Sequence, residues 1–359
     1  MSQNYCIIER PKHSTFQVMK HFIHLVMACI LFSVNLQAQP RDKEAKKLYN
    51  QAIDHIVQND YQQAIASLDQ AIRLKPQFQQ AYLQRGKLYF RIDSTRLAME
   101  DIHMAMEYGT SSGEACFYTG YLDYMEQKPD SAIRKLTQAL QKGYKHPEVY
   151  YIRGLANYDL GDYKNAIRNF SAAIDGRYDF AYAYNDRGSA KLKTGDYQGA
   201  INDFRKAVSY DGEKPSFYNN LGYARAQNND YKNALQDYTQ AINLEPNYYK
   251  AYVNRGLVRS SLEQYKEAET DLKKAIRISP EQPEAYNNLA LVYMKQKEFD
   301  QALKQFNKAL EKDQTLAEAY MNRGLAWENK GDLEKACRDW KMAEELGNKK
   351  AREYLKDCQ

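Results

Sequence analysis

Residues 215–248, PSFYNNLGYARAQNNDYKNALQDYTQAINLEPNY, decide the fold of this chain. Apolar and small residues recur in them at spacings of three and four, first around Leu221 and again around Leu235. The two runs are separated by the polar pair Asn229-Asp230. This spacing predicts two amphipathic α-helices joined by a short turn.

The ends of the second predicted helix are marked as well. Asp230 precedes it, and its carboxylate can accept hydrogen bonds from the free amides of the first helical turn. Pro246 follows it, and proline stops a helix because it has no amide hydrogen and disfavours helix in the residue before it. The same residue types recur at the same places, as Asp60, Asp162, Asp196 and Asp332 and as Pro76 and Pro280.

The stretch is one unit of a repeat with a period of 34 residues, which runs from Ala45 to Lys350 without insertion or deletion. The eighth position is always glycine or alanine, and the twentieth and twenty-seventh are always alanine. Small residues let two helices approach closely, and a single pair must stack on its neighbours to bury its apolar side. A fixed period of this length is typical of a solenoid. The repeats are 45–78, 79–112, 113–146, 147–180, 181–214, 215–248, 249–282, 283–316 and 317–350.

This pattern resembles the tetratricopeptide repeat (TPR) family. The residues that carry the resemblance are Tyr218, Leu221, Gly222, Ala234, Tyr238 and Pro246. The resemblance implies an all-α fold, a right-handed α-solenoid (superhelix) of nine helix-turn-helix units. Residues 351–359 are expected to add a C-terminal cap helix, because terminal repeats need a polar outer face.

Repeats two to five depart from the pattern at their closing position. They lack the proline there, and a glycine stands nearby instead, as Gly109, Gly143, Gly176 and Gly212. Thr95 and Pro129 also replace the aromatic residue that opens the second helix. We therefore expect the array to bend differently between residues 90 and 150.

Residues 1–39 do not share the period and form a leader. Lys20, a short apolar run and Ala38 follow the plan of a secretory signal peptide with its core in 19–38, cleaved near Ala38. The run is short for a membrane span. The mature protein is therefore expected to be exported, to the periplasm in a diderm bacterium. An uncleaved anchor, and a lipoprotein formed at Cys29, are the alternatives, and translation could start at Met1 or at Met19.

Composition and motifs argue against catalysis and against nucleic-acid binding. Basic and acidic residues are nearly balanced, 51 against 46, and no long block of one sign occurs. The six histidines are scattered, and no phosphate loop, zinc motif or nucleophile–base pair is present. We expect no enzyme activity, no cofactor and no metal site.

The resemblance places possible binding residues on the first helix of each pair, helix A, which lines the concave groove of the superhelix. The sixth repeat position usually faces this groove, and a side-chain amide there can both donate to and accept from a peptide backbone. The same amides could instead brace neighbouring helices or face water. The fifth position holds no lysine, so the chaperone-tail type of binding is disfavoured. The sixth-position residues of repeats five to nine are Asp186, Asn220, Asn254, Asn288 and Asn322.

A second candidate patch is aromatic and lies in repeats three and four. Aromatic residues supply much of the binding energy at interface hot spots. The alternative for each of them is ordinary packing between helices. The residues are Phe117, Tyr118, Tyr121, Tyr151 and Tyr158.

Cys337 and Cys358 lie at similar distances on either side of Gly347-Asn348, so an antiparallel hairpin could bring them together. Export would permit a disulfide between them. The alternative is one buried and one exposed thiol. Cys116 takes the place of a repeat tyrosine and is expected in the core.

The sequence as a whole predicts a scaffold that binds a partner peptide or helix in the groove of the superhelix. The alternatives are an accessory subunit of an envelope enzyme or of a secretion or assembly complex, and, less in keeping with the charge balance, a nucleic-acid-binding repeat.

Overall fold

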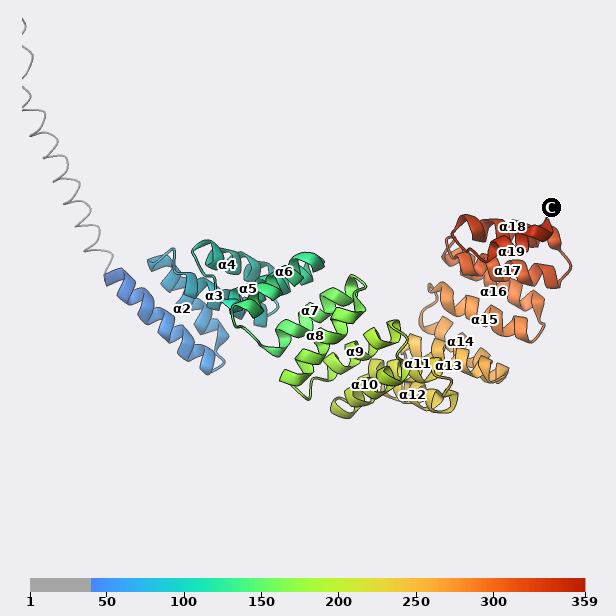
Figure 1. The fold of residues 1–359 in the computed structure, drawn as a ribbon, viewed down its shortest axis with the longest axis horizontal. Helices are drawn as coiled ribbons and strands as arrows, with labels where there is room; N and C mark the ends of the chain where they lie inside the picture. The colour runs from blue at the N-terminus through green and yellow to red at the C-terminus, as the bar shows by residue number, and fades with distance from the viewer. Residues whose placement is uncertain (1–39, 359) are drawn as a thin grey trace, which may run out of the picture. The chain divides into compact units, whose positions relative to one another are not determined.

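The computed structural model describes residues 40–358, and every regular element in that range is helical (Figure 1). The first helix covers residues 40–57 as far as it is described. The next are α2 (Tyr61–Leu74), α3 (Gln79–Arg91), α4 (Thr95–Glu107), α5 (Gly113–Met125) and α6 (Pro129–Gln141). The leader, with Met19, Cys29 and Ala38, lies outside the described residues, so its assignment as a signal peptide stays a prediction.

The chain divides into two compact units, one ending at Lys145 and one beginning at His146. This division falls between residues 90 and 150, where the closing prolines are missing. The second unit contains α7 (Pro147–Asp159), α8 (Tyr163–Gly176), α9 (Ala181–Lys193), α10 (Tyr197–Tyr210), α11 (Pro215–Gln227), α12 (Tyr231–Leu244), α13 (Tyr249–Ser261), α14 (Tyr265–Ile278), α15 (Pro283–Lys295), α16 (Phe299–Lys312), α17 (Ala317–Asn329), α18 (Leu333–Glu345) and α19 (Ala351–Tyr354), and the 3-10 helix η1 (Leu355–Cys358).

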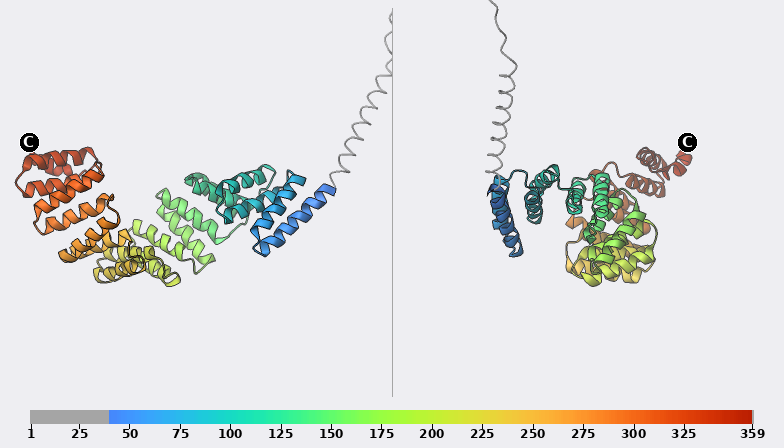
Figure 2. Two further views of the ribbon diagram at one scale, coloured as in Figure 1. Left: turned by 180° about the vertical axis from the view of Figure 1, so that it is seen from behind. Right: turned by 60° about the vertical axis from the view of Figure 1, so that its left-hand side comes forward.

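Consecutive helices pack side by side within each unit, as the views of Figure 2 also show. In the second unit the odd-numbered helices α7 to α17 are the A helices, and the even-numbered helices α8 to α18 are the B helices. Each A helix also contacts the A helix of the next repeat. The expected all-α solenoid of stacked helix pairs is therefore confirmed, and the A helices form a continuous row within the second unit.

The small repeat positions lie where helices A and B touch. A Cβ atom on Gly222 would come within 2.9 Å of the Tyr238 ring, which is closer than ordinary packing allows. Ala234 and Ala241 on the same B helix are fully buried. Each B helix fills the remaining space with one large buried side chain, in order Phe170, Phe204, Tyr238, Leu272, Phe306 and Trp340.

The predicted helix ends are also confirmed. The Asp230 carboxylate accepts a hydrogen bond from the backbone amide of Asn233, and four further aspartates make the same bond. Helix α12 ends at Leu244, two residues before Pro246. None of the helices in residues 40–358 has the length and apolar character that a membrane span requires.

The C-terminal segment packs against the last repeat. The expected single cap helix is instead the short α19 followed by the 3-10 helix η1. The Tyr354 ring lies 5.1 Å from the buried Trp340 ring, centre to centre. Cys337 on α18 and Cys358 on η1 form a disulfide. The segment is thus fixed to α18 by a ring contact and by a covalent bond.

Candidate functional site

The five sixth-position residues lie on five successive A helices, α9, α11, α13, α15 and α17. All five side chains are half-buried, so each has one side toward the helices and one toward solvent. The four asparagines among them are called the asparagine ladder below: Asn220, Asn254, Asn288 and Asn322.

Three ladder amides are hydrogen-bonded to the preceding A helix. Nδ2 of Asn220 donates to Oδ1 of Asn185 over 2.9 Å, and Nδ2 of Asn254 donates to Oδ1 of Asn219 over 3.0 Å. The corresponding bond from Asn322 to Asn287 is longer, 3.4 Å. The acceptor is in each case the fifth-position residue of the previous repeat. The ladder therefore braces neighbouring helices.

The row begins at Asp186, whose carboxylate also joins two neighbouring A helices. The Tyr151 hydroxyl on α7 donates to Asp186 over 2.7 Å, and Nδ2 of Asn185 donates to the other carboxylate oxygen over 2.9 Å. Burial raises the pKa of Asp186, and these two hydrogen bonds oppose that rise. Position five of one repeat and position six of the next are thus joined at this junction too.

Asn288 is the exception in the ladder. The fifth-position residue before it is Val253, whose side chain has no hydrogen-bond acceptor. Among the described residues Asn288 makes no side-chain hydrogen bond. It therefore keeps both amide hydrogens and its carbonyl oxygen available.

Three positions along this row of A helices are uncharged. Positions five, six and nine of α11, α13, α15 and α17 hold only asparagine, tyrosine, methionine and aliphatic residues. Tyr223 and Leu257, both at position nine, are exposed, and Leu291 and Leu325 are partly buried. The strip of ladder amides and position-nine side chains is called the A-helix face below. It offers amides beside apolar contacts, which suits a peptide backbone with apolar side chains.

The A-helix face ends beside a hollow of about 590 Å³. Met321 and Asn322 form one side of it, and the turn after α18 forms the other. Lys349 and Lys350 in this turn are exposed and supply positive charge. The full lining is Ala317, Glu318, Met321, Asn322, Leu346, Gly347, Asn348, Lys349 and Lys350.

The first unit contains three residues of the predicted aromatic patch. Phe117 is only 4% exposed, and its ring packs against those of Tyr118, Tyr121 and Tyr144. The prediction that Phe117 lies on an open surface is therefore wrong, because the side chain at position five points between the helices here. Tyr118 and Tyr121 are half-buried and both contact the Phe90 ring.

The other two aromatic candidates belong to the second unit. The Tyr151 ring lies 4.6 Å from the Phe180 ring, and the Tyr158 ring lies 5.3 Å from the Tyr163 ring. Both are half-buried, so each packs against a neighbour and keeps some exposed surface. A binding role for Tyr118, Tyr121, Tyr151 and Tyr158 stays a prediction.

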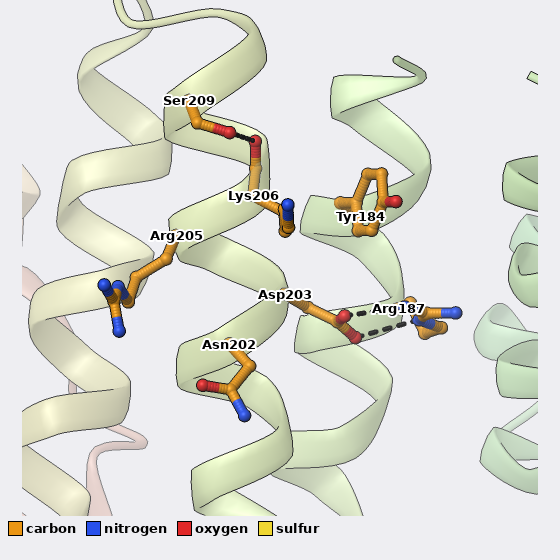
Figure 3. A pocket seen from close by; sticks show the side chains of 7 residues that line it. All are labelled: Tyr184, Arg187, Asn202, Asp203, Arg205, Lys206 and Ser209. Carbon is orange, nitrogen blue, oxygen red and sulfur yellow. Dashed lines mark hydrogen bonds and ion pairs between the residues drawn. The ribbon is translucent and has the colours of Figure 1, made fainter. Parts of the chain in front are cut away.

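A second polar ladder, of arginine and aspartate, was not predicted from the sequence; it is called the arginine ladder below. Arg187 on α9 bonds Asp203 through two nitrogens, at 2.9 and 2.7 Å (Figure 3). It donates a third bond to Ser171 on α8. Asp203 is buried. One guanidinium thus ties an A helix to the B helices on both sides.

The same arrangement recurs at two further position-seven arginines of the second unit. Arg255 bonds Asp271 and Thr239, and Arg323 bonds Asp339 and Asn307. The signal in the sequence was arginine followed by aspartate 16 residues later. A hollow of about 550 Å³ lies beside the Arg187 pair. Figure 3 draws the side chains that line it: Tyr184, Arg187, Asn202, Asp203, Arg205, Lys206 and Ser209. No trio of His, Cys, Asp or Glu within residues 40–358 is grouped to hold a metal ion.

Comparison with family models gives several matches along the chain. Models described as tetratricopeptide repeat match residues 283–316, 121–183 and 185–249, and a model described as TPR repeat matches 56–93 and 259–297. Together these ranges make up more than half of the chain. The comparison with curated proteins found no match.

Solved structures share the fold. A tetratricopeptide repeat protein from Parabacteroides merdae has a TM-score of 0.59 at 22% identity, over 68% of this chain and 97% of its own. PilF of Pseudomonas aeruginosa has a TM-score of 0.50 at 20% identity, over 58% and 94%. The Cut9–Hcn1 hetero-tetramer of the APC/C has a TM-score of 0.55 at 15% identity, over 74% of this chain and 52% of that chain.

Proposed function

Because this chain belongs to the tetratricopeptide repeat family, we propose that it is a non-catalytic scaffold that binds a partner protein through its second unit. The bound part of the partner is an extended peptide segment. Its binding surface is the A-helix face. No cofactor and no nucleic acid takes part in this function.

The neutral, amide-bearing character of the A-helix face carries this proposal. Asparagine side chains can pair with the backbone of any peptide, since each has both donors and an acceptor. The exposed Tyr223 and Leu257 beside them can cover apolar side chains of the same peptide. Recognition of this kind tolerates many sequences, because most of its hydrogen bonds go to the main chain.

We further propose that the protein works outside the cytoplasm, in the cell envelope. The leader in residues 19–38 and the Cys337–Cys358 disulfide support this location, since structural disulfides persist in oxidising compartments. N-terminal sequencing of the protein from the cell envelope tests it. A mature start close to Gln39 is expected, whereas full-length protein recovered from the cytoplasm would contradict export.

Peptide selection tests the binding function directly. A phage library of random 12-residue peptides is panned against the full chain, and the enriched peptides are labelled with fluorescein and titrated by anisotropy. Leu257→Ala removes an apolar side chain from the A-helix face and is expected to weaken binding about tenfold.

Leu262→Ala is the matched control. Leu262 belongs to the same repeat and is similarly exposed, 39% against 37% for Leu257, but it lies in the turn after α13. It is expected to leave the affinity unchanged. Equal effects of the two variants would place the peptide elsewhere, and failure to enrich any binding peptide would contradict the proposed function.

A further inference from the structure

We infer that the four residues of the asparagine ladder have two different roles. Asn288 binds the peptide main chain, whereas Asn220, Asn254 and Asn322 hold the A helices together. This inference rests on the proposed function and deepens it. It assigns one recognition residue within a row of four identical side chains.

The fifth position of the preceding repeat decides which role an asparagine takes. Where that position is asparagine, as Asn219 is for Asn254, the ladder amide donates to it. Val253 offers no acceptor to Asn288, so that junction has no such bond. Because Val253 stands where other repeats have asparagine, the whole side-chain amide of Asn288 stays available to a ligand.

The free amide is held in a defined position by the helix that carries it. Its neighbours Asn287 and Leu289 are buried, and Asn287 accepts the hydrogen bond from Asn322 on α17. On the same helix, the Tyr293 hydroxyl donates to Glu269 on α14 over 2.8 Å. Helix α15 is therefore anchored on both sides, and little order has to be gained by Asn288 when a ligand binds.

An asparagine side chain with both its N–H and C=O groups free can pair with the N–H and C=O groups of one residue in an extended peptide. In an extended chain the N–H and C=O groups of one residue point toward the same edge. Asn288 can donate to that C=O and accept from that N–H at once. A braced asparagine has already used one of its two amide hydrogens. Leu257 and Leu291, on adjacent A helices, offer apolar contact beside this pair, so the segment bound here carries apolar side chains.

Two alanine variants of the full chain separate the roles. Asn288→Ala is expected to weaken binding of the fluorescein-labelled, selected 12-residue peptides about tenfold, the worth of two ordinary hydrogen bonds, with an unchanged thermal midpoint. Asn254→Ala is the matched control. It is expected to lower the thermal midpoint and, because one of its amide hydrogens is held by Asn219, to weaken binding less than Asn288→Ala does.

A third variant tests the cause. Val253→Asn supplies the missing acceptor and is expected to draw Asn288 into a brace, which weakens binding, at most by as much as Asn288→Ala does. Val253→Ala changes the same side chain without adding an acceptor and is expected to retain near-normal affinity. If Val253→Asn fails to fold, the affinities of Asn288→Ala and Asn254→Ala are enough to show whether Asn288 binds the peptide.

The outcomes distinguish this inference from the proposed function. One outcome is that Asn288→Ala binds the peptides as well as the unmodified protein does, while Leu257→Ala no longer binds them. This outcome would overturn the role of Asn288 and leave the A-helix face as the binding surface. An unmodified protein that enriches no peptide would overturn both.

Discussion

Nδ2 of Asn254 lies 3.0 Å from Oδ1 of Asn219, and this bond joins two A helices at positions 35 residues apart in the chain. The same bond recurs between Asn220 and Asn185. A row of asparagines that resembles a peptide-binding ladder is thus also part of the structural frame. Whether an asparagine is available to a ligand depends on the residue at position five of the repeat before it.

The Asn219–Asn254 hydrogen bond predicts that substitutions at Asn219 and at Asn288 change the stability by different amounts. Asn219→Ala removes a buried acceptor from Asn254 and is expected to lower the free energy of unfolding by about 1–2 kcal/mol. Urea unfolding followed by circular dichroism measures this change. Asn288→Ala serves as the control and should cost under about 0.5 kcal/mol. Equal losses would mean that the Asn219–Asn254 bond adds no net stability.

The arginine ladder predicts a larger effect. Asp271 is buried and accepts hydrogen bonds from Arg255 and from Arg259, the latter over 2.6 Å. Asp271→Ala leaves two partly buried guanidinium groups without their counter-charge, so a loss of about 3–5 kcal/mol is expected.

Asp300→Ala is the matched control for Asp271→Ala. Asp300 is exposed and pairs with Lys330, and such surface pairs are worth about 0–1 kcal/mol. Urea unfolding compares the two variants. A loss from Asp271→Ala no greater than that from Asp300→Ala would show that the Arg255–Asp271 pair does not hold the repeats together.

Asp237 predicts a specific pH dependence. Its repeat has Leu221 in place of the position-seven arginine, and Arg225 pairs with it instead, over 2.7 Å. Burial raises the pKa of Asp237 to about 6, and the charge of Arg225 opposes this rise. Because the folded pKa exceeds the unfolded one, the folded state binds this proton more tightly. The contribution of this group to stability therefore falls as the pH rises from about 4 to about 6.

The test compares the unmodified protein with Asp237→Asn across this pH range, with the exposed Asp300→Asn as the control for loss of a carboxylate. The free energy of unfolding of the unmodified protein minus that of Asp237→Asn should decrease between pH 4 and 6 and level off above it. A difference that rises with pH would contradict the raised pKa.

The Cys337–Cys358 disulfide predicts local behaviour at the C-terminus. Reduction opens a loop with a sequence separation of 21 residues, which is worth about 3 kcal/mol. Hydrogen exchange of α18 to η1 is expected to increase on reduction, while that of α7 to α10 stays the same. The double variant Cys337→Ser with Cys358→Ser should show the faster exchange without any response to reductant. No change on reduction would mean that ring packing between Trp340 and Tyr354 alone holds this segment.

The fold was predictable because its signals are local and repeated. Gly222, Ala234 and Ala241 mark close helix contacts, and Asp230 and Pro246 mark helix ends. The structure has each of these features. Periodicity alone could not tell the buried Phe117 from the half-buried Tyr118 beside it, because both positions lie near the boundary of the helix face.

The site was predictable only in part. The repeat pattern placed Asn254 and Asn288 at equivalent positions and could not distinguish them. Their difference depends on contacts with Asn219 and Val253 in other repeats, which become neighbours only when the helices stack. The arginine ladder was visible as a spacing of 16 residues, but only the structure shows that Arg187 also reaches Ser171 in the previous repeat.

Site-specific photo-crosslinking shows directly whether a peptide binds on the A-helix face. A photoreactive benzoylphenylalanine replaces Leu257 on the A-helix face or, in a matched chain, Leu262 in the turn after α13, and each is irradiated with a selected 12-residue peptide. The peptide is expected to crosslink at position 257 and not at 262. Crosslinking at 262 alone, or equally at both, would contradict binding on the A-helix face.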